Sequence, residues 1–506
     1  MDAQRPVSAT STLKDVPFTE KDSAPMHVEE ETFIINKFAE GDPENPKNWS
    51  RGKRWYLTML SGLLFLNSTF ASSAPSSIVP QLMEEFHLSS LVGILTISLF
   101  VAGYCVGPIL WGPLSEVYGR RPIFIFPFFA YMMFTLGGAL AKNTASVLIF
   151  RFIGGTFAAA PQTNSGAMIA DIWDPETRGK AIAIFTLAPF AGPALGPIVG
   201  GFVGENVSWR WVFWVMTAFA GVCWILALLT MPETYAPVLL ARQAKRKRKA
   251  TDDERYYAPL DKRDTSLKSR MENILAKPFA ILFSEPMLMA LTLYMSFIYG
   301  CIYLLFAAYP IVFTQGHHLS PGISGLMFLA IPIGAMFGVI LYVNYYNPSY
   351  ERKANEIRPK LVPPEFRLNC TLVPSVLYAG TFFWFGWTSF PSISFAAPMT
   401  SGFVTGFAVE LLYLGLFNYI VDAYLPVAAS ALAASTVVRS LFGAAFPLFA
   451  GKMYEGLKPQ WASTLLGFIA LLMIPIPFVL QRFGPRLRAS SKYCPTEEVS
   501  PSAPLE

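Results

Sequence analysis

The chain has 506 residues, of which 53% are hydrophobic and only 14% charged, whereas soluble proteins carry about 25% charged residues. This composition excludes an ordinary soluble protein and is typical of a polytopic membrane protein. The net charge of +5 indicates no nucleic-acid partner, since the basic residues gather in a few loops. The five cysteines show no paired spacing, so we expect neither a disulfide framework nor a metal site.

The first 50 residues are rich in Ser, Thr, Asp, Glu, Lys and Pro, which predicts a disordered tail rather than a signal peptide. After this tail, mostly apolar stretches recur with the length of a membrane-crossing helix, about 20 residues. We predict twelve helical spans near residues 55–75, 91–111, 122–141, 146–168, 180–203, 210–231, 287–314, 322–346, 371–391, 398–422, 428–450 and 461–481.

The predicted spans form two groups of six, which predicts an all-α protein built from two six-helix bundles. The bundles cover residues 51–231 and 281–482, a basic linker covers 232–280, and a tail covers 483–506. Arg and Lys concentrate in the linker and in the other loops on its side, so that side and both termini are predicted to be cytoplasmic. Two such halves favour a transporter with its substrate site between them.

A charged turn is predicted between the second and third spans. Gly112 and Gly119 permit a tight turn and close packing, and Arg120 and Arg121 hold the turn on the cytoplasmic side. Glu116 precedes Arg120 by four residues and could pair with it on a helical turn. Such a turn could clamp two helices in one conformation and release them in another.

The fifth span carries small residues and prolines on neighbouring helix faces: Gly192, Pro193, Gly196, Pro197 and Gly200. Glycines four residues apart allow another helix to approach closely, and prolines make a helix bent or deformable. The fifth span could therefore be a rigid helix that only packs against its neighbour, or a flexible helix that takes part in gating. The prolines favour the gating helix.

Several of these stretches resemble the major facilitator superfamily. The 112–122 stretch is similar to the signature between the second and third helices of that family, although Glu116 stands where Asp is more frequent. The 188–201 stretch is similar to the fifth-helix signature of its twelve-span drug:proton antiporters. Three further stretches resemble fungal exporters of the cercosporin-facilitator or cycloheximide-resistance type: 209–214, 233–240 and 435–450.

The resemblance covers roughly residues 42–485 and implies a proton-coupled efflux transporter that is not an enzyme. Such a protein exports a hydrophobic or amphipathic small molecule, such as a drug, toxin or secondary metabolite, across the plasma membrane by alternating access. It is expected to act as a monomer in the lipid bilayer with no cofactor, the proton being the coupling ion. No phosphate-binding Gly-x-x-x-x-Gly-Lys-Ser/Thr loop is present to use ATP. Alternatives are a transporter of polyamines or other organic solutes and a non-transporting membrane sensor.

Three ionisable residues fall in the interior of predicted spans, where a charge costs about 3 kcal/mol or more unless it faces protein or water. Glu410 has apolar surroundings, which suits either a carboxyl that couples proton movement or a structural pair that never titrates. The resemblance assigns Arg151 to proton coupling, and the alternative is an ion partner that packs helices. Arg439 lies in the eleventh span.

Charged residues at the inner end of the fourth span are expected to form an ion-pair network with Arg120 or Arg121. The candidates are Asp171, Glu176 and Arg178, and we expect the network to hold the outward-facing state.

Aromatic and amide side chains are candidates for lining the substrate cavity, the alternative being helix packing. They are Gln162, Asn164, Tyr299, Tyr303 and Phe306. Asn206 begins an Asn-Val-Ser glycosylation sequon on the predicted outer side, very close to the membrane, and its occupancy is left open.

Overall fold

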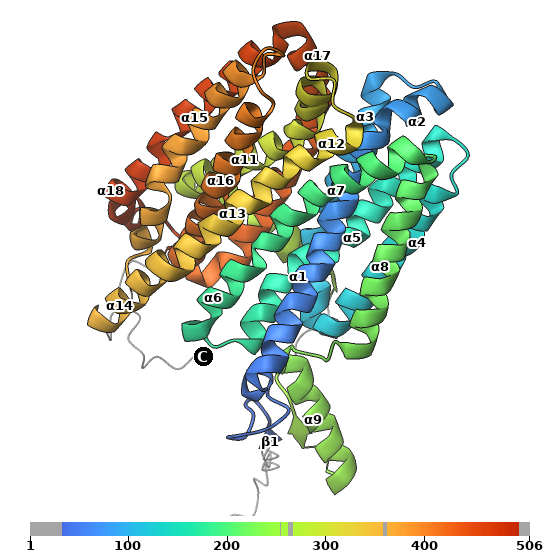
Figure 1. The fold of residues 1–506 in the computed structure, drawn as a ribbon. Helices are drawn as coiled ribbons and strands as arrows, with labels where there is room; N and C mark the ends of the chain where they lie inside the picture. The colour runs from blue at the N-terminus through green and yellow to red at the C-terminus, as the bar shows by residue number, and fades with distance from the viewer. Residues whose placement is uncertain (1–32, 254, 262–266, 358–361, 495–506) are drawn as a thin grey trace, which may run out of the picture.

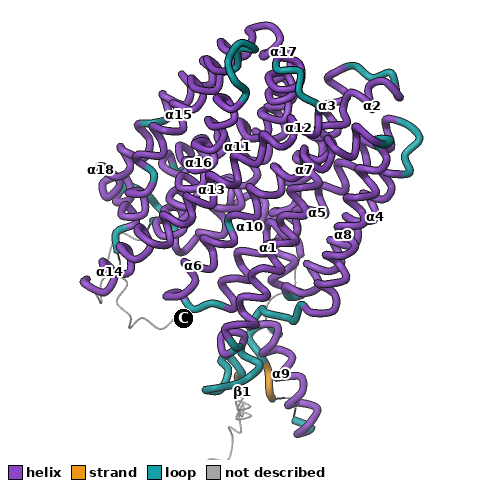
Figure 2. The backbone as a smooth tube through the Cα atoms, viewed as in Figure 1, coloured by secondary structure: helices purple, strands orange, loops and turns teal. Residues whose placement is uncertain are grey.

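The computed structural model describes residues 33–253, 255–261, 267–357 and 362–494. Helices dominate it and run side by side in two bundles (Figures 1 and 2). We call the face that carries α9, α14 and the turn between α3 and α4 the basic face, and the opposite face, which carries α2, the far face. The basic face lies at the bottom of Figure 1.

The first bundle is formed by the helices that precede the linker. They are α1 (Arg51–Ser73), the short η2 (Ala74–Ile78) and α2 (Val79–Phe86), α3 (Ser90–Tyr118), α4 (Arg120–Ala139), α5 (Thr144–Ile172), α6 (Pro175–Phe185), α7 (Leu187–Asn206) and α8 (Arg210–Thr230).

The second bundle is formed by the helices that follow the linker. They are α11 (Pro286–Tyr309) with the π-helical η3 (Pro310–Gly316), α12 (Pro321–Leu326), α13 (Ala330–Leu341) with the π-helical η5 (Tyr342–Tyr346), α14 (Asn347–Ile357), η6 (Pro364–Cys370), α15 (Leu372–Thr388), α16 (Ala396–Ala423), α17 (Ala428–Met473) and α18 (Pro475–Ala489).

Ten helical segments of the described chain are long and apolar enough to cross a membrane. There are up to eleven if Pro364–Cys370 and Leu372–Thr388, which meet at an angle of 40°, form one span. The last segment, Leu425–Ala489, has 65 residues, and its backbone leaves the helical region at Lys458 (φ 63°, ψ 158°). A single crossing needs about 20 residues, so this segment has room for two. The number twelve itself stays a prediction.

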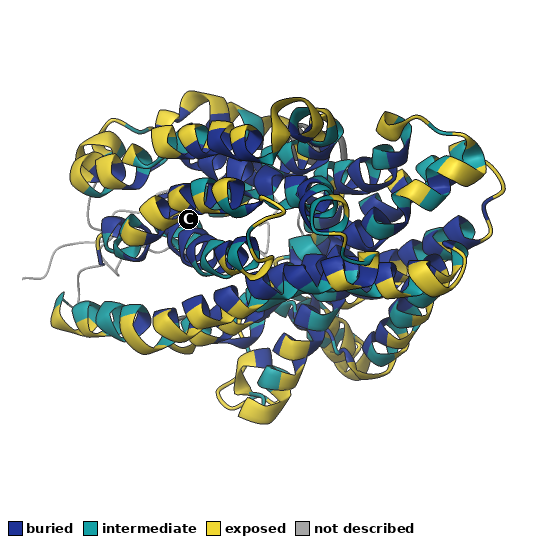
Figure 3. Cartoon of the chain, turned by 45° about the horizontal axis from the view of Figure 1, so that its top comes forward, coloured by how far each residue is buried: buried dark blue, intermediate teal, exposed yellow. Residues whose placement is uncertain are grey.

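The outer surface of the bundles suits contact with lipid rather than with water. Large apolar side chains stand exposed there, including Phe126 (71%), Leu229 (75%) and Leu472 (79%). Buried residues gather between the helices, while exposed ones follow the outer rims (Figure 3). Helices that are apolar all round are expected where one face meets other helices and the other meets lipid.

The prediction of a disordered tail is wrong for residues 33–50. Strand β1 (Phe33–Ile34) pairs in parallel with β2 (Tyr256–Tyr257), which lies in the linker between the bundles. Residues 1–32 lie outside the described residues. The linker contains helical structure: α9 (Ala236–Thr251) and most of α10 (Leu267–Ser284).

Polar contacts attach the same N-terminal segment to α9. The side-chain amide of Gln243 donates to Asp42 at 2.9 Å and to Glu44 at 3.0 Å. The bond from Gln243 lowers the pKa of Asp42 below its usual value. Arg246 adds an ion pair to Glu44. The local composition of this segment predicts disorder. That prediction fails because the residues that order the segment lie about two hundred residues further along the chain.

The glycines of the fifth predicted span pack α7 against α1. A Cβ at Gly192 would lie 2.6 Å from the carbonyl oxygen of Leu66, and a Cβ at Gly196 would lie 2.6 Å from the backbone nitrogen of Ala74. Both distances are well below van der Waals contact. The two backbones therefore approach as closely as glycine allows, which is how helices associate where lipid offers no hydrophobic driving force.

We predict that Gly196→Ala destabilises the protein by about 1–3 kcal/mol, the usual penalty of overpacking against backbone. Gly166→Ala is the matched control, because among the described residues nothing lies within 4 Å of a Cβ at Gly166. Thermal unfolding of the detergent-purified protein should give a lower midpoint for Gly196→Ala only. Equal midpoints for the two variants would contradict the packing.

Candidate functional site

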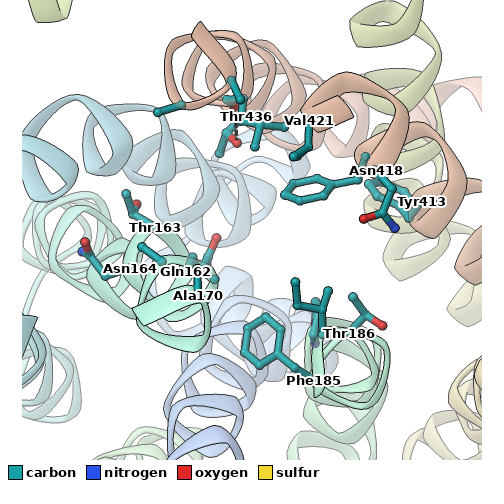
Figure 4. A pocket seen from close by; sticks show the side chains of 18 of the residues that line it. Gln162, Thr163, Asn164, Ala170, Phe185, Thr186, Tyr413, Asn418, Val421 and Thr436 are labelled. Atoms are coloured by element: carbon teal, nitrogen blue, oxygen red, sulfur yellow. Dashed lines mark hydrogen bonds between the residues drawn. The ribbon is translucent and has the colours of Figure 1, made fainter. Parts of the chain in front are cut away.

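A large cavity lies between the two bundles, with a volume of about 1970 Å³. Figure 4 shows how helices of both bundles surround it: Ala170 comes from α5, Thr186 from the junction of α6 and α7, Tyr413 from α16 and Thr436 from α17. A volume of this size exceeds the roughly 300–1,000 Å³ of ordinary small-molecule pockets, and leaves space for both a solute and water.

The lining of the cavity runs from the basic face to the middle of the bundles. At the mouth lie Arg51 and Lys180, and at the inner end lie Thr69, Tyr303 and Arg439. The cavity therefore opens toward the basic face.

Contacts between the bundles close the cavity beyond its inner end. The hydroxyls of Ser72 on α1 and Tyr303 on α11 lie 2.8 Å apart. Nearer the far face, the backbone N–H of Gly322 donates to the carboxylate of Glu205 at 2.5 Å. These contacts hold the bundles together between the cavity and the far face.

Glycines let α7 and α12 meet backbone to backbone in this closed region. A Cβ at Gly325 would lie 2.6 Å from the carbonyl oxygen of Pro197, and a Cβ at Gly201 would lie 2.7 Å from that of Pro321. The closure on the far face depends on this approach.

Glu410 is fully buried and contacts the other bundle. Its Oε1 lies 2.6 Å from the hydroxyl oxygen of Thr186, which lies 2.6 Å from the carbonyl oxygen of Ala183. The Oε2 atom of Glu410 has no partner among the described residues.

A hydroxyl has one hydrogen to donate, so Thr186 serves either Glu410 or Ala183. An ionised Glu410 accepts that hydrogen. A protonated Glu410 donates to Thr186 instead, and the hydroxyl hydrogen then turns to Ala183. Both forms of the carboxyl group are hydrogen-bonded with the heavy atoms in place, which is what reversible protonation of a buried acid requires.

Arg151 lies outside the cavity lining and joins three helices of the first bundle. Its Nε donates to the carbonyl oxygen of Thr96 on α3 at 2.7 Å, and its Nη2 donates to that of Ser72 on α1 at 3.3 Å. Its guanidinium carbon lies 4.0 Å from the ring centre of Phe100. Carbonyl oxygens rather than a carboxylate therefore compensate this buried charge. Because Ser72 contacts Tyr303, Arg151 also supports the closure at the inner end of the cavity.

Arg439 lines the inner end of the cavity beside two aromatic rings. Its guanidinium carbon lies 4.9 Å from the ring centre of Tyr299 and 6.0 Å from that of Tyr413. The position of Arg439 inside a predicted span marks it as unusual in the sequence, but the sequence offers no partner from which to infer its role.

The turn between α3 and α4 is narrower than predicted. The turn is at Gly119 (φ 97°), while Gly112 lies inside α3 and lines the cavity. A Cβ at Gly119 would lie 2.6 Å from the carboxyl carbon of Glu233. That carboxylate accepts from the backbone N–H groups of Arg120 at 2.8 Å and Arg121 at 3.2 Å, so it caps the start of α4.

Sequence reasoning missed the role of Glu233, which is buried and follows α8 by three residues. Its partners lie more than a hundred residues away, so local spacing carries no signal for the pair.

Arg120 pairs with Asp171 rather than with Glu116. The Nε of Arg120 lies 3.0 Å from the carboxylate of Asp171, and its Nη1 donates to Ser115 at 2.5 Å. Glu116 is exposed and lines the cavity, as does the partly buried Arg178.

The side chain of Glu176 lies outside the described residues. The pair between Arg120 and Asp171 joins α4 to α5 within one bundle and is present while the cavity opens to the basic face. It does not by itself distinguish the two states of a transporter.

The other predicted residues lie in different environments. Pro193, like Tyr299 and Tyr303, lines the cavity, whereas the carbonyl oxygen of Pro197 accepts from Ser77 at 2.9 Å. Phe306 is absent from the lining and packs on Phe328, with ring centres 5.4 Å apart.

Gln162 and Asn164 both border the cavity. The Nδ2 of Asn164 donates to the carbonyl oxygens of Ala160 at 3.0 Å and Trp111 at 3.4 Å, so it packs helices. Gln162 has a buried Nε2 without a partner among the described residues. Asn206 is exposed at the end of α7 on the far face.

Comparison with solved structures supports the arrangement of the bundles. The human organic anion transporter MFSD10 (TETRAN) matches with a TM-score of 0.60 and 18% identity, over 86% of this chain and 100% of its own. The proton:xylose symporter XylE matches with a TM-score of 0.60 and 16% identity, over 86% of this chain and 96% of its own. At these identities the likeness concerns the fold alone.

Curated relatives are similar over most of their length. "Efflux pump FUB11" of Gibberella moniliformis is 42% identical over 463 residues, covering 91% of this chain and 77% of its own. "Major facilitator superfamily multidrug transporter mdrA" of Aspergillus fumigatus is 43% identical over 460 residues, covering 90% and 75%. "Citrinin biosynthesis cluster MFS transporter mrr1" of Monascus ruber is 39% identical over 485 residues, covering 95% of each chain.

Residues 60–447 match the family model described as Major Facilitator Superfamily. That match covers most of both bundles and the linker between them, and it agrees with the two-bundle fold and with the relatives. The chain belongs to the Major Facilitator Superfamily.

Proposed function

We propose that the protein exports hydrophobic or amphipathic small molecules across the plasma membrane by alternating access. The observation that carries the proposal is the cavity between the bundles, which opens to the basic face and is closed toward the far face. The printed names of the relatives, efflux pumps and multidrug or biosynthesis-cluster transporters, support export as its direction.

The basic face corresponds to the cytoplasm in this proposal, because Lys and Arg near span ends resist translocation. The described conformation is then inward-open, ready to take a solute from the cytoplasm or the inner leaflet. Both ends of the chain are cytoplasmic, and Asn206 lies outside, where its sequon is a candidate for glycosylation. One chain surrounds the whole cavity, so a monomer suffices for transport.

A transport cycle requires the bundles to exchange contacts. Solute binding in the cavity would close the mouth around it, while the backbone contact between α7 and α12 would open. The prolines of α7 and the break in the helix at Thr186 make this element suited to bending, since each removes or weakens backbone hydrogen bonds. Gating by α7 and by the turn at Gly119 is part of the proposal.

Protons supply the free energy in this proposal, with Glu410 as the coupling group. Its contact with Thr186 joins the bundles beside the cavity and accommodates both forms of the carboxyl group. The ionised form holds α16 to α7, so an empty carrier without a proton would stay inward-open. Protonation of Glu410 replaces its charge-assisted bond to Thr186 with a weaker, neutral one. The weaker bond lets the empty carrier move between its outward-open and inward-open states. Arg151 contributes by positioning Ser72 at the closure.

We predict that Glu410→Gln uncouples transport from the proton gradient. Glutamine can donate to Thr186 as the protonated acid does, but it cannot release a proton. In sealed proteoliposomes with a panel of fluorescent lipophilic dyes, an imposed pH step should raise the initial rate in the wild type and change it less than about twofold in the variant.

Solute exchange without a gradient should persist in Glu410→Gln. Glu351→Gln is the control, since Glu351 is a carboxyl at the mouth of the same cavity, and it should keep the response to the pH step. A full response in Glu410→Gln would remove this residue from the coupling mechanism.

Replacing Thr186 with Val should move the pH dependence of transport to higher pH, because the ionised carboxylate of Glu410 loses its only donor among the described residues. A hydrogen bond to a charged group contributes about 1.5–3 kcal/mol, so the shift should be about one pH unit or more.

Thr186→Ser retains the hydroxyl and should behave as the wild type. The measurement is the initial rate of solute efflux from vesicles between pH 5 and 9, each at zero gradient. Identical profiles for Val and Ser at position 186 would show that the contact has no role in proton release.

A further inference from the structure

One cation deep in the cavity has no counter-charge among the residues that the structure describes. Arg439 lies eleven residues into α17, so at about 1.5 Å per residue it is about 16 Å from the basic-face end of that helix. This depth is about half of a hydrocarbon core that is about 30 Å thick. The positive-inside rule explains Arg51, Arg178 and Lys180 at the mouth. It does not explain a guanidinium at this depth.

No ion pair forms with Arg439 among the described residues. Its Nε is buried and has no hydrogen-bond partner there. The buried carboxyl group of Glu410 bonds to Thr186 instead. The hydroxyl of Tyr413 donates to the carbonyl oxygen of Met295 at 2.8 Å, so it can only accept from Arg439, and as a neutral group it supplies no counter-charge. A charge this deep is costly unless it faces water or a partner, so Arg439 calls for an anion.

The chain also provides a flat surface beside the guanidinium. Gly443 follows Arg439 by one helical turn, and a Cβ there would lie 2.7 Å from the ring of Tyr299. The missing side chain therefore lets this ring pack directly on α17. Tyr299 and Arg439 line the same end of the cavity, with the guanidinium carbon 4.9 Å from the ring centre. A planar carboxylate matches the guanidinium fork, and an aromatic ring matches the tyrosine face.

We propose that the transported solute is an aromatic carboxylate, whose anionic group binds Arg439 while its ring packs against Tyr299. This inference rests on the proposed transport function, because it names the solute of the same cavity. Polyamines and other cations would meet an uncompensated positive charge at the inner end. The acidic groups in the lining lie nearer the mouth, and Asp422 among them is already paired with Arg367 at 2.8 Å.

The test compares three compounds of one shape: naphthoate, naphthamide and naphthylmethylammonium. Their binding to the purified full-length protein in nanodiscs is measured by isothermal titration calorimetry above the acid's titration range. We expect naphthoate to bind at least about tenfold more tightly than the amide, as a charge-assisted hydrogen bond predicts, and the ammonium compound to bind weakest. Arg439→Gln should reduce the ratio of the naphthoate affinity to the naphthamide affinity to about one, while Arg439→Lys should keep part of the preference for naphthoate.

Two matched variants separate charge from packing. Arg178→Gln removes a cation at the mouth and should leave the ratio unchanged. Gly443→Ala displaces the ring of Tyr299 and should weaken the anion and the amide alike. If Arg439→Gln does not fold, the wild-type ratio and Arg439→Lys decide the matter.

Equal affinities of the anion and amide in the wild type, or an undiminished preference in a folded Arg439→Gln, would overturn the inference. A preference that depends on Arg439, without any flux driven by a pH step, would refute the proposed pump and leave the anion site intact. If a pH step drives flux of neutral or cationic dyes and Arg439→Gln leaves that flux unchanged, the proposed pump stands and the anion site is refuted.

Discussion

The close approach of α7 and α12 on the far face determines the state in which the protein is found. At Gly201 and Gly325 a single added carbon would clash with the backbone of the opposite bundle. Inside a membrane, apolar side chains gain little by leaving lipid for protein, so helices are held together by such close contacts and by polar bonds. The open mouth, the depth of the cavity and the position of Glu410 beside it all depend on this closure.

Three ionisable side chains deep in the bundles are compensated in three different ways. Carbonyl oxygens surround Arg151, one threonine hydroxyl serves Glu410, and two aromatic rings flank Arg439. In the first arrangement both Nε and Nη2 of Arg151 donate to carbonyl oxygens, which suits a structural role. In the other two, one polar atom has no partner within the described part of the chain: Oε2 of Glu410 and Nε of Arg439. In the proposed mechanism, the unpartnered Nε of Arg439 has a donor to offer a solute, while the hydroxyl of Thr186 bonds to Glu410 in either protonation state.

Much of the fold could be predicted from the sequence because membrane spans depend on local composition. The apolar stretches predicted the two-bundle fold, and the helical spacing of Gly192 and Gly196 predicted one packing face. Residues 33–50 were mistaken for disorder because the helix that orders them, α9, is distant in sequence.

The site was less predictable, since its contacts cross from one bundle to the other. The sequence pointed to Glu410 and Tyr299 but gave no sign of Thr186 as the partner of Glu410. Helical spacing placed Phe306 with Tyr299 and Tyr303, yet the structure packs its ring on Phe328 instead of in the cavity. Spacing defines a helix face, and only the arrangement of all the helices decides whether that face meets protein or a cavity.

Alternating access is the central claim, and distances between spin labels in nanodiscs test it most directly. One pair of labels, at Asn206 and Ile323, spans α7 and α12 on the far face, and a second, at Tyr118 and Ala429, spans the mouth between α3 and α17. Across a pH series, we expect the first distance distribution to gain a longer component in the same samples in which the second gains a shorter one. If both distributions stay fixed at every pH, or lengthen together, the account of two bundles that open one face at a time is contradicted.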